Sequence, residues 1–365
     1  MKPWEANLRR VVPYVPGEQP KGSNLIKLNT NENPYPPSPL VQQVQLEMET
    51  DDLRKYPDPG ALCLVRSLAK YYGLQEDQIF VGVGSDDVLA MAFLTFFNSG
   101  KPVLFPDITY SFYKVWADLF HIPYETPALD KDFAIVSGDY QRENGGVVFP
   151  NPNAPTGLYM PLEQVEEIIK ANQDVIVVVD EAYIDFAGPS ARELLDSYEN
   201  LLVVQTFSKS RSMAGLRIGF AMGHPDLIRA LNDVKYSYNS YTMNLPSQCM
   251  GVAAVEDKAY FEKRVRQIID TRERAKLRLK ELGFSSPDSQ ANFLFVSHKS
   301  VPASALFEAL RQQQIYVRYF NAPRLDNSLR ITIGTDEEME ELFTFLEAYL
   351  YSVNGNGDEA DERGK

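Results

Sequence analysis

The stretch Leu201-Leu202-Val203-Val204-Gln205-Thr206-Phe207-Ser208-Lys209-Ser210-Arg211-Ser212-Met213-Ala214-Gly215-Leu216-Arg217 decides the fold that we expect for this chain. It begins with an apolar run, which is typical of a strand buried on both faces of a parallel sheet. Lys209 follows that strand among small hydroxylated residues. A desolvated lysine amine loses its proton readily and can form a Schiff base with a carbonyl. A lysine that extends from the strand end into solvent is the alternative.

The composition limits the class of protein. A chain of 365 residues with 44% hydrophobic content can bury a large core and form two domains. Its formal net charge of -14 argues against a nucleic-acid or anionic-membrane surface, because phosphate binding needs clustered Lys and Arg. The expected partners are small molecules and a second copy of the chain. Cys63, Cys249 and the histidines 121, 224 and 298 are scattered, so we expect no metal site.

The sequence also bears on location. No apolar run approaches the roughly 20 residues needed to span a bilayer. The first residues, Met1-Lys2-Pro3-Trp4-Glu5, lack the apolar segment of a signal peptide. We therefore expect a cytoplasmic protein.

Between about residues 75 and 225, short apolar runs alternate with helical patterns, which is typical of an α/β sheet covered by helices on both faces. The expected strands cover residues 78–83, 102–105, 146–149, 175–179, 201–206 and 218–222, and the expected helices cover 86–97, 111–120 and 162–171. The pattern predicts a large, doubly wound, mostly parallel sheet.

From about residue 255 the pattern changes to that of a smaller α+β domain. We expect a charged helix to Leu282, an apolar run at 292–296, a helix at 303–313, strands at 315–318 and 328–333, and a helix from 336 to about 351. The expected organisation is an N-terminal arm over the active site (1–35), a large domain (36–250), a small domain (251–352) and a disordered acidic tail (353–365).

Polar residues follow the expected strands, at the edge where open α/β sheets bind ligands. Gly84, Ser85 and Asp86 lie where a strand turns into a helix, so the free N–H groups of the helix start could hold an anion. An ordinary capped helix start is the alternative. Asp86 and Asp87 would repel a phosphate, so their side chains are expected to point away if the backbone binds it. Thr206, Ser208 and Arg217 could also hold a phosphate.

A carboxylate at the end of an apolar strand is costly unless it meets a cation. Asp180 occupies such a position, and a protonated pyridine nitrogen would be a suitable cation; a helix cap is the alternative. Tyr183 could donate a hydrogen bond to an oxygen on the same ring, and Tyr110 could stack on its face. Asn153 lies in a proline-rich loop after another expected strand, where its amide could reach a ligand.

In combination these motifs resemble the pyridoxal-phosphate enzymes of the aspartate-aminotransferase fold, and among them the histidinol-phosphate aminotransferase family. The resemblance extends from Pro13-Tyr14 to Gly334-Thr335 and implies a seven-stranded sheet with pyridoxal 5'-phosphate as cofactor. It implies that Lys209 binds the cofactor covalently, that Asp180 contacts the pyridine nitrogen, that Tyr183 contacts the 3-hydroxyl and that Tyr110 covers the ring. The residues that it assigns to the cofactor phosphate are Ser85, Asp86, Thr206, Ser208 and Arg217.

The resemblance also implies a homodimer and a substrate site. Tyr56 matches the tyrosine that reaches the phosphate of the neighbouring subunit's cofactor. Arg318 and Arg330 match the pair that grips substrate anions; a surface salt bridge is the alternative for Arg318. Tyr14 and the loop around Asn31 match the segment that covers the substrate.

The loop before Thr156 departs from the family pattern. The family usually has Asn-Asn-Pro-Thr-Gly, and its asparagine before the proline touches the cofactor's 3-oxygen. Here that position is Ala154. Either Asn153 takes over the contact, which we favour, or Tyr183 serves alone.

The implied reaction is transamination of L-histidinol phosphate with 2-oxoglutarate, giving imidazole-acetol phosphate and glutamate in histidine biosynthesis. An aromatic aminotransferase or a threonine-phosphate decarboxylase would share the cofactor residues. A non-catalytic nucleotide-binding or scaffold protein is a more remote alternative.

Overall fold

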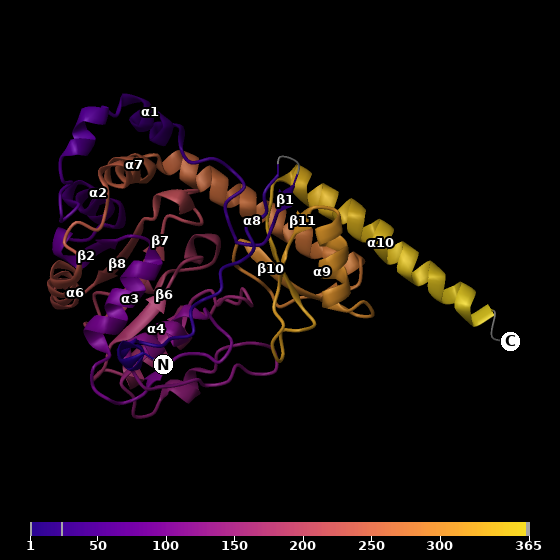
Figure 1. The fold of residues 1–365 in the computed structure, drawn as a ribbon, viewed down its shortest axis with the longest axis horizontal. Helices are drawn as coiled ribbons and strands as arrows, with labels where there is room; N and C mark the ends of the chain where they lie inside the picture. Colours follow the sequence, from indigo (N-terminus) through magenta and orange to yellow (C-terminus); the bar gives the residue numbers. More distant parts are fainter. Residues whose placement is uncertain (1, 23–24, 363–365) are drawn as a thin grey trace.

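The computed structural model describes residues 2–22 and 25–362, and their side chains as far as residue 353. Among these residues, seven strands form the large sheet (Figure 1). Their spatial order is β2 (Ile79–Gly82), β8 (Gly219–Gly223), β7 (Leu201–Thr206), β6 (Val177–Asp180), β5 (Gly146–Pro150), β3 (Val103–Leu104) and β4 (Tyr124–Glu125). Strand β8 runs antiparallel to both of its neighbours, and the other neighbouring pairs are parallel.

Helices cover both faces of this sheet, which confirms the doubly wound prediction. Val177 and Val179 of β6 belong to the core on one face, and Val178 belongs to the core on the other. Continuous apolar strands arise because successive side chains enter opposite cores. Helices α1 (Pro39–Glu47), α2 (Leu62–Tyr72), α5 (Leu162–Ala171) and α7 (Leu245–Glu256) pack in the first core, and α3 (Ser85–Phe96), α4 (Phe112–Phe120) and α6 (Pro225–Tyr238) pack in the second.

The parallel register brings the polar strand ends to one edge. Pro150 of β5 pairs with Asp180 of β6, and Asp180 pairs with Val204 of β7. Thr206 therefore ends β7 two residues beyond the level of Asp180. The loops that follow these strands all leave the sheet on the same side.

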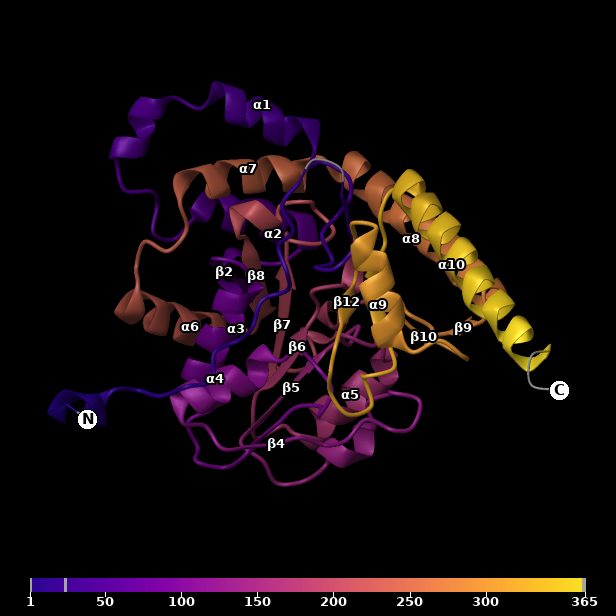
Figure 2. The same cartoon turned by 45° about the vertical axis from the view of Figure 1, so that its right-hand side comes forward.

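The small domain contains an antiparallel sheet that, in the described part of the chain, has four strands. Their order is β12 (Arg318–Tyr319), β13 (Leu329–Thr332), β10 (Phe293–His298) and β9 (Phe284–Ser285). Figure 2 shows this sheet beside α8 (Lys258–Glu281), α9 (Ala303–Gln312) and α10 (Asp336–Glu362). The N-terminal arm joins this domain, because β1 (Ile26–Lys27) pairs in parallel with β11 (Ile315–Tyr316) and Leu28 enters the small-domain core.

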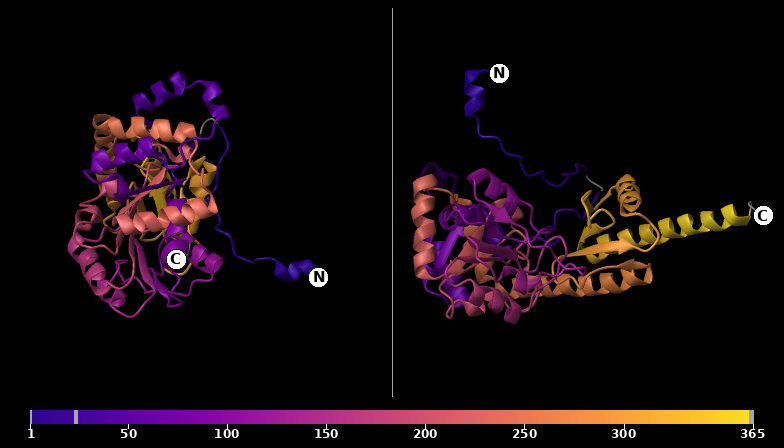
Figure 3. Two further views of the ribbon diagram at one scale, coloured as in Figure 1. Left: turned by 90° about the vertical axis from the view of Figure 1, so that its left-hand side faces the viewer. Right: turned by 90° about the horizontal axis from the view of Figure 1, so that it is seen from below.

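The sequence predicts that the whole arm (residues 1–35) covers the active site, but the beginning of the arm lies elsewhere. Its first turn, η1 (Pro3–Asn7), stands off the body of the molecule (Figure 3). Trp4, Val12 and Val15 are exposed. Arg9 donates to the Leu119 carbonyl of α4, and from Tyr14 onward the arm contacts the residues that build the site.

The expected division at residues 250/251 falls within α7 (Leu245–Glu256). Ala253, Ala254 and Val255 lie in the core of the large domain. The charged helix expected from residue 255 begins instead at Lys258, since the side chain of Asp257 caps it by accepting from the Tyr260 N–H (3.2 Å). We therefore propose a domain boundary that follows Glu256.

Helix α10 continues to Glu362, whereas the sequence predicts an end near residue 351 and a disordered tail from 353. Extending an existing helix needs no new nucleation, so a polar segment can follow a packed helix as further turns. The side chains from residue 354 and the whole of residues 363–365 lie outside the described residues. Within residues 2–22 and 25–362, no helix is both long and apolar enough to cross a membrane.

The absence of a side chain at Gly219 allows β8 to lie close to the turn before α3. A Cβ added at Gly219 would lie 2.3 Å from the Gly84 carbonyl carbon and 2.3 Å from the Ser85 nitrogen. Both atoms are backbone and cannot rotate away. We expect Gly219→Ala to lower the free energy of unfolding by roughly 1–3 kcal/mol, measured by urea denaturation. Gly138→Ala, where the added Cβ meets nothing within 4 Å, is the control. Equal effects of the two variants would contradict this account.

Candidate active site

Lys209 lies in the loop after β7, half-buried, and is held by the N-terminal arm. Its Nζ donates to the Thr30 carbonyl (3.1 Å) and lies 5.7 Å from the centre of the Tyr183 ring. The Asn33 amide donates to the carbonyls of Lys209 and Ser210, at 3.1 Å each. The lysine therefore projects toward Tyr183 and away from bulk solvent.

Asp180 is buried at the end of β6 without a cation. It accepts from the Tyr113 hydroxyl (2.7 Å) and from the Ala182 N–H (3.2 Å). In the described part of the chain it forms no ion pair, and burial raises its pKa to about 6 even though both donors lower it. The site thus presents a carboxylate that a protonated ring nitrogen would complete.

Tyr183 connects the arm to the small domain. Its hydroxyl accepts from the Asn31 amide (2.9 Å), and its ring packs edge to face against Phe293 at 5.0 Å. Asn31 has a positive φ of 56°, and its backbone N–H donates to the Thr332 hydroxyl (3.0 Å). The residue expected to cover the substrate is therefore bound to Tyr183 here.

The expected phosphate site lies where β2 turns into α3. Arg217 donates to the Asp86 carboxylate (2.9 Å) and to the Ser208 hydroxyl (3.4 Å), and the Thr206 hydroxyl donates to Ser208 (3.1 Å). Gly84 has a φ of +87°, and a Cβ there would lie 2.6 Å from the Arg217 guanidinium. Glycine at this position lets the arginine approach the start of α3, beside the half-buried Ser85.

The orientation of Asp86 differs from the prediction that the side chains of Asp86 and Asp87 both point away from the phosphate site. Asp87 turns back and accepts from the Val83 N–H (2.9 Å), but Asp86 faces Arg217 and accepts from the Tyr110 hydroxyl (2.7 Å). The guanidinium supplies the compensating charge that makes this orientation favourable. Burial, followed by the charge of Asp86, raises the pKa of Tyr110, which therefore stays protonated.

Aromatic rings surround the expected position of the cofactor ring. Tyr110 meets Tyr113 edge to face at 5.8 Å. Tyr14, from the arm, stacks on Phe112 at 4.2 Å and lies 6.4 Å from Tyr110. The arm thus brings Tyr14 to the mouth of the same region.

Both ends of the Asn153 amide are engaged by the loop before Tyr110. Its oxygen accepts from the Thr109 hydroxyl (3.0 Å), and its nitrogen donates to the Ile108 carbonyl (3.0 Å). Ala154 packs in a small apolar cluster with Phe293, against which Tyr183 lies. The contact between Asn153 and a cofactor oxygen remains a prediction, and the second N–H of the amide, which donates to neither of these partners, is the group that would make it.

Two arginines of the small sheet are register partners. Arg318 of β12 pairs with Arg330 of β13. Arg330 donates to the Asn29 carbonyl (3.0 Å), its guanidinium lies 5.4 Å from the Phe293 ring, and its buried Nε has no partner within the described residues. Burial lowers its pKa. Since neither arginine forms an ion pair in residues 2–22 and 25–353, the pair is free to bind an anion.

Tyr56 is separate from the other candidate residues in the single chain. It is 82% exposed, and its ring lies 4.7 Å from that of Tyr241. This position agrees with a residue that would act outside its own subunit.

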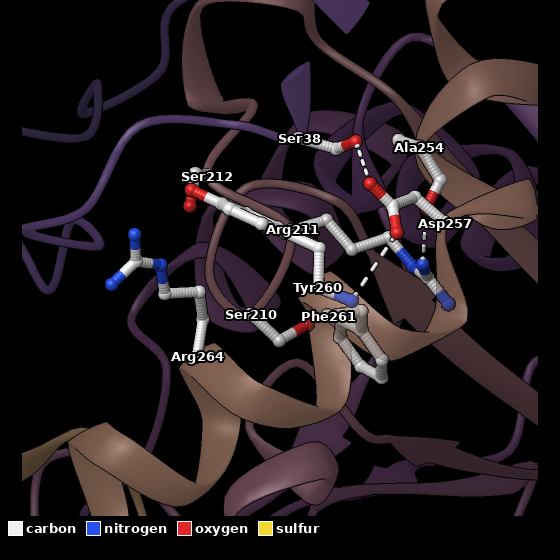
Figure 4. Close-up of a pocket in the computed structure, with 9 residues that line it drawn as sticks. All are labelled: Ser38, Ser210, Arg211, Ser212, Ala254, Asp257, Tyr260, Phe261 and Arg264. Atoms are coloured by element: carbon white, nitrogen blue, oxygen red, sulfur yellow. Dashed lines mark hydrogen bonds between the residues drawn. The ribbon is translucent and has the colours of Figure 1, made fainter. Parts of the chain in front are cut away.

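The sequence did not single out several residues that hold the site. Tyr113 bonds Asp180, Thr30 and Asn33 hold Lys209, and Arg211 anchors the following segment. Arg211 is buried against Phe261, 4.0 Å from the ring centre, and donates to the Ala254 carbonyl (2.8 Å; Figure 4). Tyr113 sits at an apolar helix position, and only a hydroxyl at such a position hints at a buried acceptor. The described residues contain no group of three or more His, Cys, Asp or Glu that could hold a metal ion.

This fold, with a lysine after its central strand, is that of the aminotransferases that use pyridoxal phosphate. The family model described as aminotransferase class I and II matches residues 23–346. The chain belongs to this family and, within it, to the histidinol-phosphate aminotransferases, as the following similarities show.

Histidinol-phosphate aminotransferase of Lactococcus lactis subsp. cremoris (strain MG1363) is 52% identical over 347 residues, which cover 95% of this chain and 98% of that protein. The Clostridium acetobutylicum enzyme of the same name is 52% identical over 339 residues, covering 93% and 96%. The crystal structure of histidinol-phosphate aminotransferase from Sinorhizobium meliloti in complex with pyridoxal-5'-phosphate has a TM-score of 0.81 at 24% identity, covering 90% of this chain and 91% of that chain. These findings confirm the predicted fold and aminotransferase class.

The raised pKa of Asp180 predicts that ionisation of this group lowers the free energy of unfolding of the cofactor-free protein, by an amount that depends on pH. Its pKa rises from 3.8 to about 6 on folding, so the folded state holds the extra proton between these values. The penalty for ionising the buried group is absent below the unfolded pKa and complete above about pH 6. We expect Asp180→Asn to stabilise the cofactor-free protein by about 2 kcal/mol more at pH 7.5 than at pH 4.5.

Urea denaturation of both proteins at the two pH values measures this difference. Asp118→Asn, at an exposed carboxylate of α4, is the control and should show no such change. A stabilisation by Asp180→Asn that does not vary with pH would contradict the assignment of the raised pKa to Asp180.

Proposed function

We propose that this chain transaminates L-histidinol phosphate with 2-oxoglutarate, giving imidazole-acetol phosphate and glutamate in histidine biosynthesis. The observation that carries the proposal is the half-buried Arg330 guanidinium, whose buried Nε has no hydrogen-bond partner and which meets no anion among the described residues. With Arg318 beside it, it suits a phosphate or carboxylate group through charge-assisted hydrogen bonds. Relatives 52% identical over nearly the whole chain carry the name of this activity.

The site fits pyridoxal 5'-phosphate, which when bound supplies a carbonyl that reacts with amines and a ring that accepts electron density. Asp180 would hold the ring nitrogen in its protonated form, Tyr183 would donate to the ring oxygen, and Tyr110 would cover one face. The groups that would bind the phosphate are the N–H groups at Ser85 and Asp86 and the side chains of Thr206, Ser208 and Arg217. Asn153 is the remaining candidate for the ring oxygen.

Lys209 is the residue that would move the proton during the reaction. Its amine, once free, takes the proton from the substrate's α-carbon as a general base. The Thr30 carbonyl accepts from Nζ at 3.1 Å, so the arm holds the amine inside the site. Asn31 orients Tyr183, and Tyr14 would close the substrate site from the arm.

We also infer a homodimer in which Tyr56 reaches the cofactor phosphate of the partner subunit. Tyr56 borders a surface groove of about 500 Å³ that is lined in part by Val44, Met48 and Leu245. Leu46 and Leu53, close to this groove in sequence, are also exposed. The groove also carries the charged side chains of Glu47, Asp52 and Lys55, and a surface that mixes apolar and charged side chains suits an interface with a second copy of the chain. The cytoplasmic location expected from the sequence remains a prediction.

The Lys209→Ala variant tests the central assignment. We expect kcat to fall by roughly 10²–10⁴-fold or more, because the base is removed. Borohydride treatment of the wild-type protein loaded with pyridoxal phosphate should fix a label on Lys209, and peptide mapping should find none in the variant. Lys170→Met, at an exposed lysine of α5, should keep the label at position 209. A label elsewhere in the wild-type protein would reject the assignment.

The Arg330→Gln variant tests the substrate. Loss of a charge-assisted contact should lower kcat/KM for histidinol phosphate by roughly 10–100-fold, mainly through KM. Arg229→Gln, at an exposed arginine of α6, is the control. Steady-state rates of the wild-type enzyme with phenylalanine and threonine phosphate complete the test. Equal rates with phenylalanine, or decarboxylation of threonine phosphate, would favour the alternative activities over the proposed one.

A further inference from the structure

Lys235 is a lysine in the core of the large domain. It lies in α6 and is 4% exposed. Burying an ammonium group costs several kcal/mol unless the charge is compensated. Asp58 and Asp87 are the nearest carboxylates that favour its charged form, but in the described residues neither forms an ion pair with it. An apolar side chain of similar length would fill this space without that penalty, so the ammonium group requires a reason.

The hydrogen bond of Lys235 supplies that reason. Its Nζ donates to the Pro59 carbonyl at 2.7 Å. Pro59 belongs to the segment 55–60, which contains Tyr56 and which we define as the Tyr56 segment. A second buried donor holds the same segment, because the Gln248 amide donates to the Asp58 carbonyl at 2.9 Å.

The Tyr56 segment is thus fixed from inside the molecule while Tyr56 points outward. The Asp58 carboxylate accepts from the N–H groups of Gly60 (3.0 Å) and Leu62 (2.8 Å), which ties the segment to the start of α2. Gln248 is 2% exposed, whereas Tyr56 is 82% exposed. The two buried donors come from different helices, α6 and α7, so the segment is braced at two successive carbonyls.

The hydrogen bonds of the phosphate loop in the same subunit do not involve Lys235. Asp87 keeps its carboxylate on the Val83 N–H (2.9 Å), and Arg217 and Asp86 pair directly with each other (2.9 Å). Removing the Lys235 ammonium group would therefore leave the groups around its own subunit's site joined. The loss would fall on the Tyr56 segment.

We propose that Lys235, together with Gln248, is a positioning residue for the cofactor site of the partner subunit, because it holds the Tyr56 segment in the position from which Tyr56 reaches across. The inference rests on the dimer contact described under the proposed function. A substitution at Lys235 should therefore weaken cofactor binding in the partner subunit and not in its own subunit. A residue that only stabilises its own subunit would not produce this pattern.

Hybrid dimers test this directly. Two differently tagged chains are co-expressed and the mixed dimer is purified, with Lys209→Ala in one chain so that the dimer has a single covalent cofactor site. Lys235→Met is placed either in the chain that keeps Lys209 or in the Lys209→Ala chain. The cofactor that remains bound at Lys209 after dialysis is measured by its visible absorption.

We expect Lys235→Met in the Lys209→Ala chain to weaken cofactor retention roughly tenfold, the size of one lost hydrogen bond to a charged group. The same substitution in the chain that keeps Lys209 should change retention less than twofold. Gln248→Leu should show the same asymmetry and decides the matter if Lys235→Met does not fold. Lys170→Met is the matched lysine control and should have no effect in either chain.

Tyr56→Phe in the same two placements separates the inference from its premise. If Tyr56→Phe has no effect in trans, the proposed dimer contact fails, and the positioning role fails with it. If Tyr56→Phe acts in trans while Lys235→Met and Gln248→Leu act equally in both placements or in neither, the positioning role alone is overturned.

Discussion

The uncompensated carboxylate of Asp180 is the constraint on which the site depends. It lies at the end of a strand whose other residues are buried and apolar, and its hydrogen bonds come from Tyr113 and Ala182. Parallel pairing places it level with Pro150 and Val204, so its position is set by the whole sheet. These two hydrogen bonds favour the charged form but do not offset the cost of burial, so the pKa stays raised and a cation would stabilise the carboxylate further. The fold therefore creates a requirement that the cofactor's ring nitrogen would meet under the proposed function.

The N-terminal arm completes the site by contacting its separate parts within a few residues. The Asn29 carbonyl accepts from Arg330, the Thr30 carbonyl accepts from Lys209, and the Asn31 amide donates to Tyr183. Because β1 fastens the arm to β11 of the small domain, a shift of that domain would move the arm relative to Lys209 and Tyr183 of the large domain. The arm thus links the arginines that would grip the substrate to the lysine that would act on it.

The sequence predicts the bounds of fully buried strands and of amphipathic helices. It does not predict features that depend on contacts between residues far apart in the chain. The strand 201–206 and the helix 162–171 match β7 and α5 residue for residue, since an apolar run and an amphipathic repeat define them locally. The two-residue strands β1 and β4 have no such pattern. The orientation of Asp86 depends on Arg217, far away in the chain, and Tyr113 reads as an ordinary helix position. The roles of Arg318 and Arg330 came from the family resemblance, because an arginine in a short strand does not by itself specify a ligand.

At the expected phosphate site, opposite charges partly cancel one another. Arg217 supplies a positive charge there, but Asp86 pairs with it at 2.9 Å and removes much of its effect. A bound phosphate carries up to about two negative charges and would repel Asp86. The N–H groups at the start of α3 and the hydroxyls of Thr206 and Ser208 offset part of that repulsion as hydrogen-bond donors. A further donor from outside the subunit would make the balance favourable, and an exposed tyrosine braced from within is suited to provide it.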